Sequence, residues 1–416
     1  MIFNKPIQLA SKLWIRWDKP ILWILIAEMA EKAIFSLPYV FACLLLLKGH
    51  NPGIDLMLRY NEVQLWFSGG NVYSYSQLPK GGVYPPASHV ILWPFLTYSS
   101  WVFVRCLWVI TSLAGLVGLV YLLVGASKAY DFKEKAFVGL MILATNATHI
   151  NILKGQLTIH TLAFLVSGLV LIGEYSQKQQ NRWQLSLLAG FLIAVALVKP
   201  TITVPFLLIP MFVPQGRLIA IITVIIYTLL ALLATAFQDS NIVMLHLEWL
   251  ERGTIGAVLG SKDSAGMMGG YGDIHSFLDS VGMSEFNFES SILILAIFAV
   301  WLYFHRFVDL WLLIGIASLV SRFWAYHRMY DDILIILPMV TLFRLTKQTT
   351  LDRTSRTLSG ILLGIATFSI LFFDRLLFLN SPGIALFVSG QVTIWILMLG
   401  FLVFQAFVQR NKIIQL

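Results

Sequence analysis

The sequence has few charged residues and almost no cysteine. Only 12% of its 416 residues are Asp, Glu, Lys or Arg, about half the share found in soluble domains, whereas 58% are hydrophobic. This composition excludes an ordinary soluble enzyme. The two cysteines, Cys43 and Cys106, each lie inside an apolar run, which excludes a disulfide framework and a cysteine-based zinc site.

Several catalytic and nucleotide-binding motifs are also missing. The chain contains no Gly-x-x-x-x-Gly-Lys, no His-Glu-x-x-His, no Gly-x-Ser-x-Gly and no Asp-x-Asp pattern. These absences argue against a nucleotide phosphate loop, a zinc peptidase and the nucleophile turn of an α/β-hydrolase. The lack of Asp-x-Asp also disfavours a nucleotide-sugar enzyme that chelates a divalent metal.

Apolar runs separated by short polar gaps fill most of the chain. Since about 20 residues cross a bilayer as a helix, we expect an all-α polytopic membrane protein with about 12 helices. Residues 33–407 would form a single membrane domain. The basic, tryptophan-rich residues 1–32 predict an amphipathic helix on the cytoplasmic surface. The expected helices cover residues 33–47, 101–126, 136–151, 157–173, 186–198, 201–213, 218–237, 290–304, 310–320, 332–343, 358–373 and 384–407.

The charges of the loops indicate an orientation. With the N-terminus inside, 18 Lys and Arg residues fall on the cytoplasmic side and ten on the other, and Arg105 lies within a helix. This bias agrees with the positive-inside rule. Both termini, including a tail over residues 408–416, are therefore predicted to be cytoplasmic. We expect an integral protein of a bacterial inner membrane, with its active site on the external face.

Two long external segments cover residues 48–100 and 238–289. Within the first, residues 85–97 are too short to span and predict a helix that dips into the outer leaflet. The second contains seven glycines between Gly253 and Gly272 and is followed by His275. It is interpreted either as a mobile lid over the site or as a plain flexible loop.

Polar residues that are costly at membrane depth gather on this external side. Asp55 is either a first-turn acid stabilised by a helix dipole or a general base at the membrane surface. Lys154 and Lys199 could reach the lipid headgroups or clamp a phosphate. Tyr84, followed by two prolines, is more typical of a structural turn. Arg59 also lies on this side.

The stretch from Arg322 to Asp332 is rich in both aromatic and charged residues, which favours a site. His327 and Arg328 could engage a phosphate, and Asp331 and Asp332 could orient them or bind substrate hydroxyls. Salt bridges within the stretch are the simpler alternative.

The order of short motifs resembles glycosyltransferase family 87. The matching elements are Gly53-Ile54-Asp55, Gly69-Gly70-Asn71-Val72-Tyr73, Val83-Tyr84-Pro85-Pro86 with Pro94, Lys154-Gly155-Gln156, Ala189-Gly190 leading to Leu197-Val198-Lys199-Pro200, and a late His-containing segment ending at Pro338. Members of this family look like polyprenyl-phosphate-mannose-dependent mannosyltransferases of the bacterial envelope. The resemblance implies the C-type glycosyltransferase fold with an outward-facing site.

The resemblance also implies roles for individual residues. Asp55 would be the catalytic base. Lys199, Lys154 and Gln156 would line the donor cavity, with His327 near the phosphate or the acceptor. The expected activity is inverting transfer of a hexose, mannose by resemblance, from a polyprenyl phosphate to a lipid-linked or glycan acceptor. We expect neither a cofactor nor a metal, because cationic side chains can neutralise the leaving phosphate, and no nucleic-acid partner.

Other classes remain open from the sequence. A transporter or lipid flippase would also have many helices and buried charge, although the long external loops are asymmetric. An envelope glycan polymerase or ligase is a nearer alternative, with a different lipid-linked donor.

Overall fold

The computed structural model describes residues 4–46, 53–74, 76–78, 81–175, 182–263, 272–372 and 380–414. Over these residues the chain is helical, without a strand. The order of the elements is α1 (Asn4–Leu46), α2 (Ile54–Phe67), α3 (Pro86–Leu96), α4 (Trp101–Ala126), α5 (Phe132–Ala144), α6 (Asn146–Lys154), α7 (Thr158–Tyr175), α8 (Arg182–Ala196), α9 (Pro200–Phe212), η1 (Pro214–Gly216), α10 (Arg217–Thr235), α11 (Ile242–Asp263), α12 (Ile274–Ser280), η2 (Ser284–Phe286), α13 (Asn287–His305), α14 (Leu310–Phe323), η3 (Met329–Ile335), α15 (Ile336–Lys347), α16 (Arg353–Phe372) and α17 (Asn380–Ile414).

Six of the described helices are long and apolar enough to cross a membrane, or seven if the bent pair α5 and α6 counts as one span. Their outer faces carry large apolar side chains. On α10, for example, Ile221, Ile225 and Leu229 are more than half exposed. Apolar side chains turned outward in this way suit contact with lipid rather than water. The chain is therefore an all-helical integral membrane protein.

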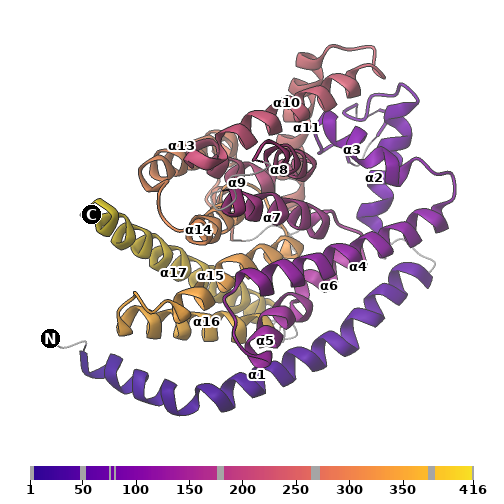
Figure 1. The fold of residues 1–416 in the computed structure, drawn as a ribbon. Coiled ribbons are helices and arrows are strands. Elements are labelled where there is room, and N and C mark those ends of the chain that lie inside the picture. Colours follow the sequence, from indigo (N-terminus) through magenta and orange to yellow (C-terminus); the bar gives the residue numbers. More distant parts are fainter. Residues whose placement is uncertain are drawn as a thin grey trace.

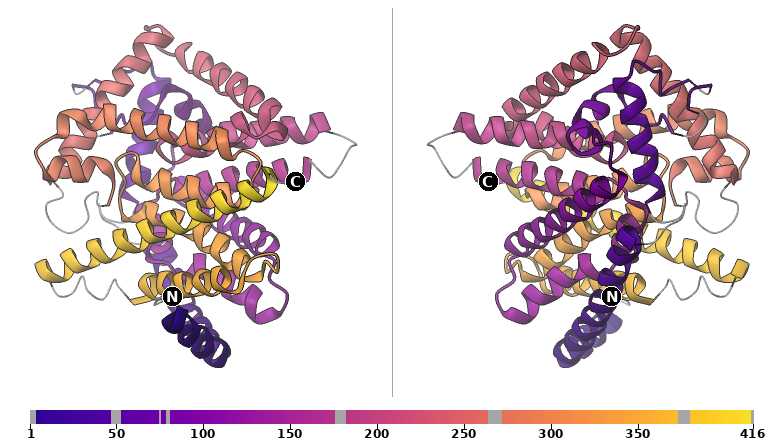
Figure 2. Two further views of the ribbon diagram at one scale, coloured as in Figure 1. Left: turned by 90° about the vertical axis from the view of Figure 1, so that its left-hand side faces the viewer. Right: turned by 90° about the vertical axis from the view of Figure 1, so that its right-hand side faces the viewer.

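One edge of the bundle is formed by a single long helix, whereas several short helices gather at another part of it. Figure 1 shows α1 as a rod along one edge, while α2, α3 and α11 gather at the opposite corner. Helix α17 packs on α14 and α16 (Figure 2). Each predicted apolar range overlaps a helix, but the bounds differ, most clearly at two places. Helix α1 runs without a break through residue 32, and its apolar stretch begins at Pro20.

The second difference is a bend in the range predicted as one helix over 136–151. Helices α5 and α6 meet there at 44°, because Thr145 between them has extended backbone angles (φ −72°, ψ 136°). The bend directs α6 toward η3, against which it packs. The sequence does mark this place, because Thr145, a residue type favoured before a helix start, is followed by the polar residues Asn146, Thr148 and His149.

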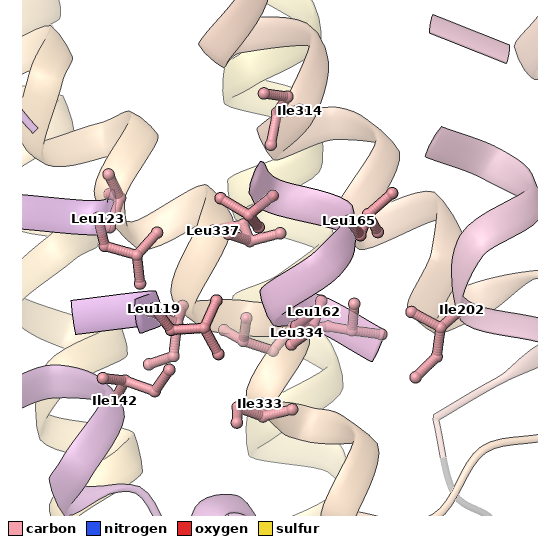
Figure 3. Close-up of a cluster of buried hydrophobic side chains, with 14 of the residues drawn as sticks. Leu119, Leu123, Ile142, Leu162, Leu165, Ile202, Ile314, Ile333, Leu334 and Leu337 are labelled. Atoms are coloured by element: carbon pink, nitrogen blue, oxygen red, sulfur yellow. The ribbon is translucent and has the colours of Figure 1, made fainter. Parts of the chain in front are cut away.

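The core lies where α4, α5, α7, α9, α14, η3 and α15 meet. Leu119, Leu162, Ile314 and Leu334 are almost fully buried and come from four of the elements around it (Figure 3). Ile333 and Leu334 of η3 point into this core. Asp331 and Asp332 directly precede Ile333. The packing of η3 therefore holds both carboxylates at the end of the bundle where other polar side chains gather.

Candidate functional site

Several helices begin or end at one face of the bundle, and polar side chains gather there. Asp55 lies in the first turn of α2, and residues 155–158 form the turn between α6 and α7. Lys199 immediately precedes α9, and residues 324–328 join α14 to η3. The topology thus brings four chain segments, far apart in sequence, to one place.

Asp55 is held by a single neutral side chain. The Nε2 atom of Gln156 donates a hydrogen bond to Oδ2 of Asp55 over 2.6 Å. The other carboxylate oxygen, Oδ1, accepts no hydrogen bond from a described residue. The side chain is half-buried, and its position in the first turn of α2 is favourable for a carboxylate because of the helix dipole.

Two glycines allow this contact. The backbone N–H of Gly53 donates to the carbonyl of Leu153 over 2.7 Å, which joins the start of α2 to the end of α6. Gly155 has φ +70°, and a Cβ atom there would lie 2.5 Å from Cβ of Leu56. A larger residue would be strained and would push α2 away. Gly155 therefore fixes the distance between Gln156 and Asp55.

Lys199 and Asp331 form a buried ion pair. Lys199 precedes Pro200, which is the first residue of α9 and sets where that helix starts. Its Nζ lies 2.5 Å from Oδ1 of Asp331 and 2.9 Å from Oγ1 of Thr158. Thr158 itself donates to the same carboxylate oxygen over 2.8 Å. Both charged side chains are less than a tenth exposed.

His327 completes the environment of Asp331. Its Nδ1 lies 3.0 Å from Oδ2 of Asp331, and because a carboxylate only accepts, Nδ1 carries the proton. Burial alone would raise the pKa of Asp331, but the ammonium of Lys199 and the hydrogen bond from His327 hold it well below its usual value. Asp331 is therefore an ionised, fully occupied carboxylate rather than a free base.

Two buried tyrosines, Tyr330 and Tyr84, lie within the electrostatic reach of both Asp331 and Asp55. The Nζ of Lys199 lies 4.9 Å from the ring centre of Tyr330. Burial, together with the carboxylates of Asp55 and Asp331, raises the pKa of Tyr330. Arg59 lies 4.3 Å from the ring centre of Tyr84 and forms an ion pair with Glu62 over 2.8 Å. Burial raises the pKa of Tyr84 as well.

The remaining predicted residues have other partners than Asp55. Arg328 is half-buried, and its Nε donates to the hydroxyl of Tyr326 over 2.9 Å. Although burial opposes it, the neighbouring tyrosines and Asp55 raise the pKa of Arg328. His275 instead contacts Ser291, 2.7 Å away, behind His327. No hydrogen bond or ion pair within the described residues joins Lys154 to the cluster.

Sequence reasoning did not assign a role to three residues that hold the site together. Thr158 bridges Lys199 and Asp331, and Asn151 donates to the carbonyl of Tyr330 over 2.5 Å. Asp273 accepts from the backbone N–H of His327 over 3.1 Å. Their signal in the sequence is weak, since each is a polar residue beside an apolar run.

The stretch from Arg322 to Asp332 is partly structural. Arg322 contacts Asp332 over 2.7 Å, so the alternative of a salt bridge within the stretch is confirmed for this pair. The glycine-rich segment interpreted as a lid or a loop lies largely outside the described residues, at positions 264–271. Among the residues that are described, no three His, Cys, Asp or Glu side chains are grouped so that they could hold a metal ion.

This arrangement can support proton transfer beside an anion. One carboxylate, Asp55, keeps an oxygen without a described hydrogen-bond partner, and a second, Asp331, is neutralised by Lys199. Arg328 adds a positive charge close to Asp55, without an ion-pair partner among the described acids. Such a pair of groups can take a proton from a hydroxyl and stabilise a nearby negative charge.

Comparison with known proteins is consistent with this chemistry. No curated protein matches the chain. Residues 83–258 match glycosyltransferase family 87, a range that contains Tyr84, Lys154, Gln156 and Lys199 but not Asp55 or Asp331. Over this segment the chain is similar to glycosyltransferase family 87, a family of membrane glycosyltransferases.

Proposed function

We propose that the protein transfers a hexose, mannose, from a polyprenyl phosphate to a lipid-linked or glycan acceptor at the external face of a bacterial inner membrane. The proposal includes both termini on the cytoplasmic side, about 12 membrane helices and the C-type glycosyltransferase fold. It is carried by one observation, the carboxylate of Asp55 held through Oδ2 by Gln156 with Oδ1 left to act. The acidic partner nearby, Asp331, has both oxygens occupied.

The proposed reaction is a single inverting displacement. The acceptor oxygen attacks the anomeric carbon, and its proton passes to Oδ1 of Asp55. The bond between the anomeric carbon and the phosphate oxygen breaks, and the bonding pair leaves with polyprenyl phosphate. The donor phosphodiester carries one negative charge and the leaving phosphate two. Cations therefore assist departure more than an acid would.

Arg328 is the residue that we propose binds the phosphate of the donor. Its guanidinium lies within the electrostatic reach of Asp55, and no described acid forms an ion pair with it. Lys199 has one donor hydrogen beyond those directed at Asp331 and Thr158, since an ammonium has three. Arg59 is compensated by Glu62. In this scheme Arg328 binds the phosphate and Lys199 assists.

The test is transfer by the purified full-length protein from a panel of polyprenyl-phosphate sugars, with and without chelator. We expect turnover with polyprenyl-phosphate mannose, a product of inverted configuration and equal rates in EDTA. Turnover only with a nucleotide sugar, or a loss in EDTA that one divalent ion restores, would contradict the proposal. Sugar movement across vesicles without transfer would support the transporter alternative.

A further inference from the structure

A groove with two arginines lies at the other end of the bundle. It has a volume of about 280 Å³ and is bounded by the end of α13, the residues that follow it and the last turns of α17. Its wall includes His305, Arg306 and Arg410 together with aromatic residues, and none of the residues lining it is acidic. The groove is therefore electropositive.

The groove and the candidate site lie at opposite ends of α13. Helix α13 begins beside the site, where Ser291 contacts His275, and ends at His305. With 19 residues and a rise of 1.5 Å per residue, this helix separates its two ends by about 27 Å, close to the thickness of a bilayer core. A ligand of the groove is thus distinct from a ligand at Asp55.

The arginines are fixed in place by aromatic rings. The guanidinium of Arg306 lies 4.2 Å from the ring centre of Tyr303 and 4.7 Å from that of Phe307. The guanidinium of Arg410 lies 5.5 Å from the ring centre of Phe304. Cation–π contacts of this kind restrain a guanidinium without neutralising its charge. Both charges therefore remain available to an anion in the groove.

His305, which also lines the groove, has a ring nitrogen without a hydrogen-bond partner. The side chain is 6% exposed and stacks on Trp301 with ring centres 4.3 Å apart. Its Nδ1 lies 2.8 Å from the carbonyl of Trp301 and must carry the proton, because a carbonyl only accepts. In the neutral ring Nε2 is then an acceptor, and this buried atom has no hydrogen-bond partner. It can accept a hydrogen bond from a donor in the groove.

We propose that this groove binds an anionic phospholipid whose headgroup carries a hydroxyl. The two arginines would hold the phosphodiester, and the headgroup hydroxyl would donate to Nε2 of His305. The position at the end of two membrane helices favours a lipid over a soluble phosphate, since acyl chains can follow the apolar outer faces of α13 and α17. This site is independent of the glycosyltransferase chemistry.

The experiment is lipid binding by the full-length protein, measured by native mass spectrometry from micelles that contain defined dioleoyl lipids. Phosphatidylglycerol should bind about 10-fold more tightly than phosphatidylcholine, because two basic side chains face its charge. Arg306→Ala combined with Arg410→Ala should remove most of that preference, and the double Lys variant should keep it. The matched control is Arg217→Ala with Arg353→Ala, two exposed arginines at the starts of α10 and α16.

The hydroxyl is tested with phosphatidylmethanol, which has the same charge and no headgroup hydroxyl. Wild type should prefer phosphatidylglycerol by about 3- to 5-fold, the value of one hydrogen bond, and His305→Phe should lose this preference while it keeps the ring stack. Equal binding of phosphatidylcholine, or unchanged binding by the double Ala variant, would overturn the proposal. Displacement of the lipid by an equal concentration of inorganic phosphate would overturn the lipid assignment.

Discussion

Asp55 and Asp331 are two carboxylates at the same end of one helical bundle, and they are held in opposite ways. Asp331 is buried, and Lys199, Thr158 and His327 occupy both of its oxygens. Asp55 is half-buried and has one neutral partner, Gln156. A carboxylate that is fully paired stabilises a fold, whereas one that keeps an oxygen available can take a proton. On our proposal Asp331 is therefore a structural residue and Asp55 takes the proton.

The largest effect on stability is expected from Asp331→Asn. The variant leaves the ammonium of Lys199 buried without its counter-ion, which costs about 3–5 kcal/mol of unfolding free energy. Thermal or denaturant unfolding in detergent micelles measures this loss. The matched control is Asp309→Asn, which removes a more exposed ion pair with Arg344 and should cost under about 1 kcal/mol. Equal losses for both variants would refute the buried role of Asp331.

Acid should weaken the fold through the same carboxylate. Because the pKa of Asp331 is lower in the folded protein, its contribution is complete above the unfolded value of about 3.9 and is lost as the pH falls below that value. The midpoint of thermal unfolding should therefore drop as the pH falls from about 4 toward about 2. The drop should be smaller in Asp331→Asn. If both proteins respond equally, another group is responsible.

A smaller change is expected from Gly155→Ala, which acts on the other carboxylate. Positive φ and the close approach of Leu56 make alanine unfavourable there by about 1–3 kcal/mol. Transfer activity should fall as well, because α2 and Asp55 are displaced. Gly118→Ala in α4 is the control, since nothing lies within 4 Å of a Cβ atom at that position. Similar behaviour of the two variants would contradict the role given to Gly155.

The smallest effect is expected from Gln156→Leu. One hydrogen bond to Asp55 is lost, so kcat should fall by about 10-fold with little change in KM or in stability. Gln238→Leu is the matched control, because Gln238 donates one hydrogen bond to the carbonyl of Trp66, away from Asp55. A fall in stability without a fall in kcat would make Gln156 a structural residue only.

The sequence predicted the elements of the site better than their partners. Apolar runs located the helices, and the cost of charge at membrane depth pointed to Asp55, Lys199, His327 and Asp331. The pairing of Lys199 with Asp331 spans 132 residues and depends on how α9 and η3 pack, which hydropathy does not encode. The break at Thr145 differs, because polar residues mark its position in the sequence, whereas the bend of 44° depends on the backbone angles there.

The lysines illustrate this difference. Lys154 and Lys199 each lie between two predicted helices and directly precede a glycine or a proline, so the sequence does not distinguish them. In the structure Lys199 is buried in the ion pair, whereas Lys154 lies half-exposed at the end of α6. Which of two similar residues enters a site was decided by tertiary packing.

The most direct test of the central claim is the turnover of Asp55→Asn with polyprenyl-phosphate mannose. The substitution preserves shape and removes the base, so we expect turnover to fall by a factor of about 10²–10⁴ while the unfolding midpoint stays near that of wild type. Asp309→Asn, at a distant ion pair, should keep full turnover. Normal transfer by folded Asp55→Asn would contradict the account.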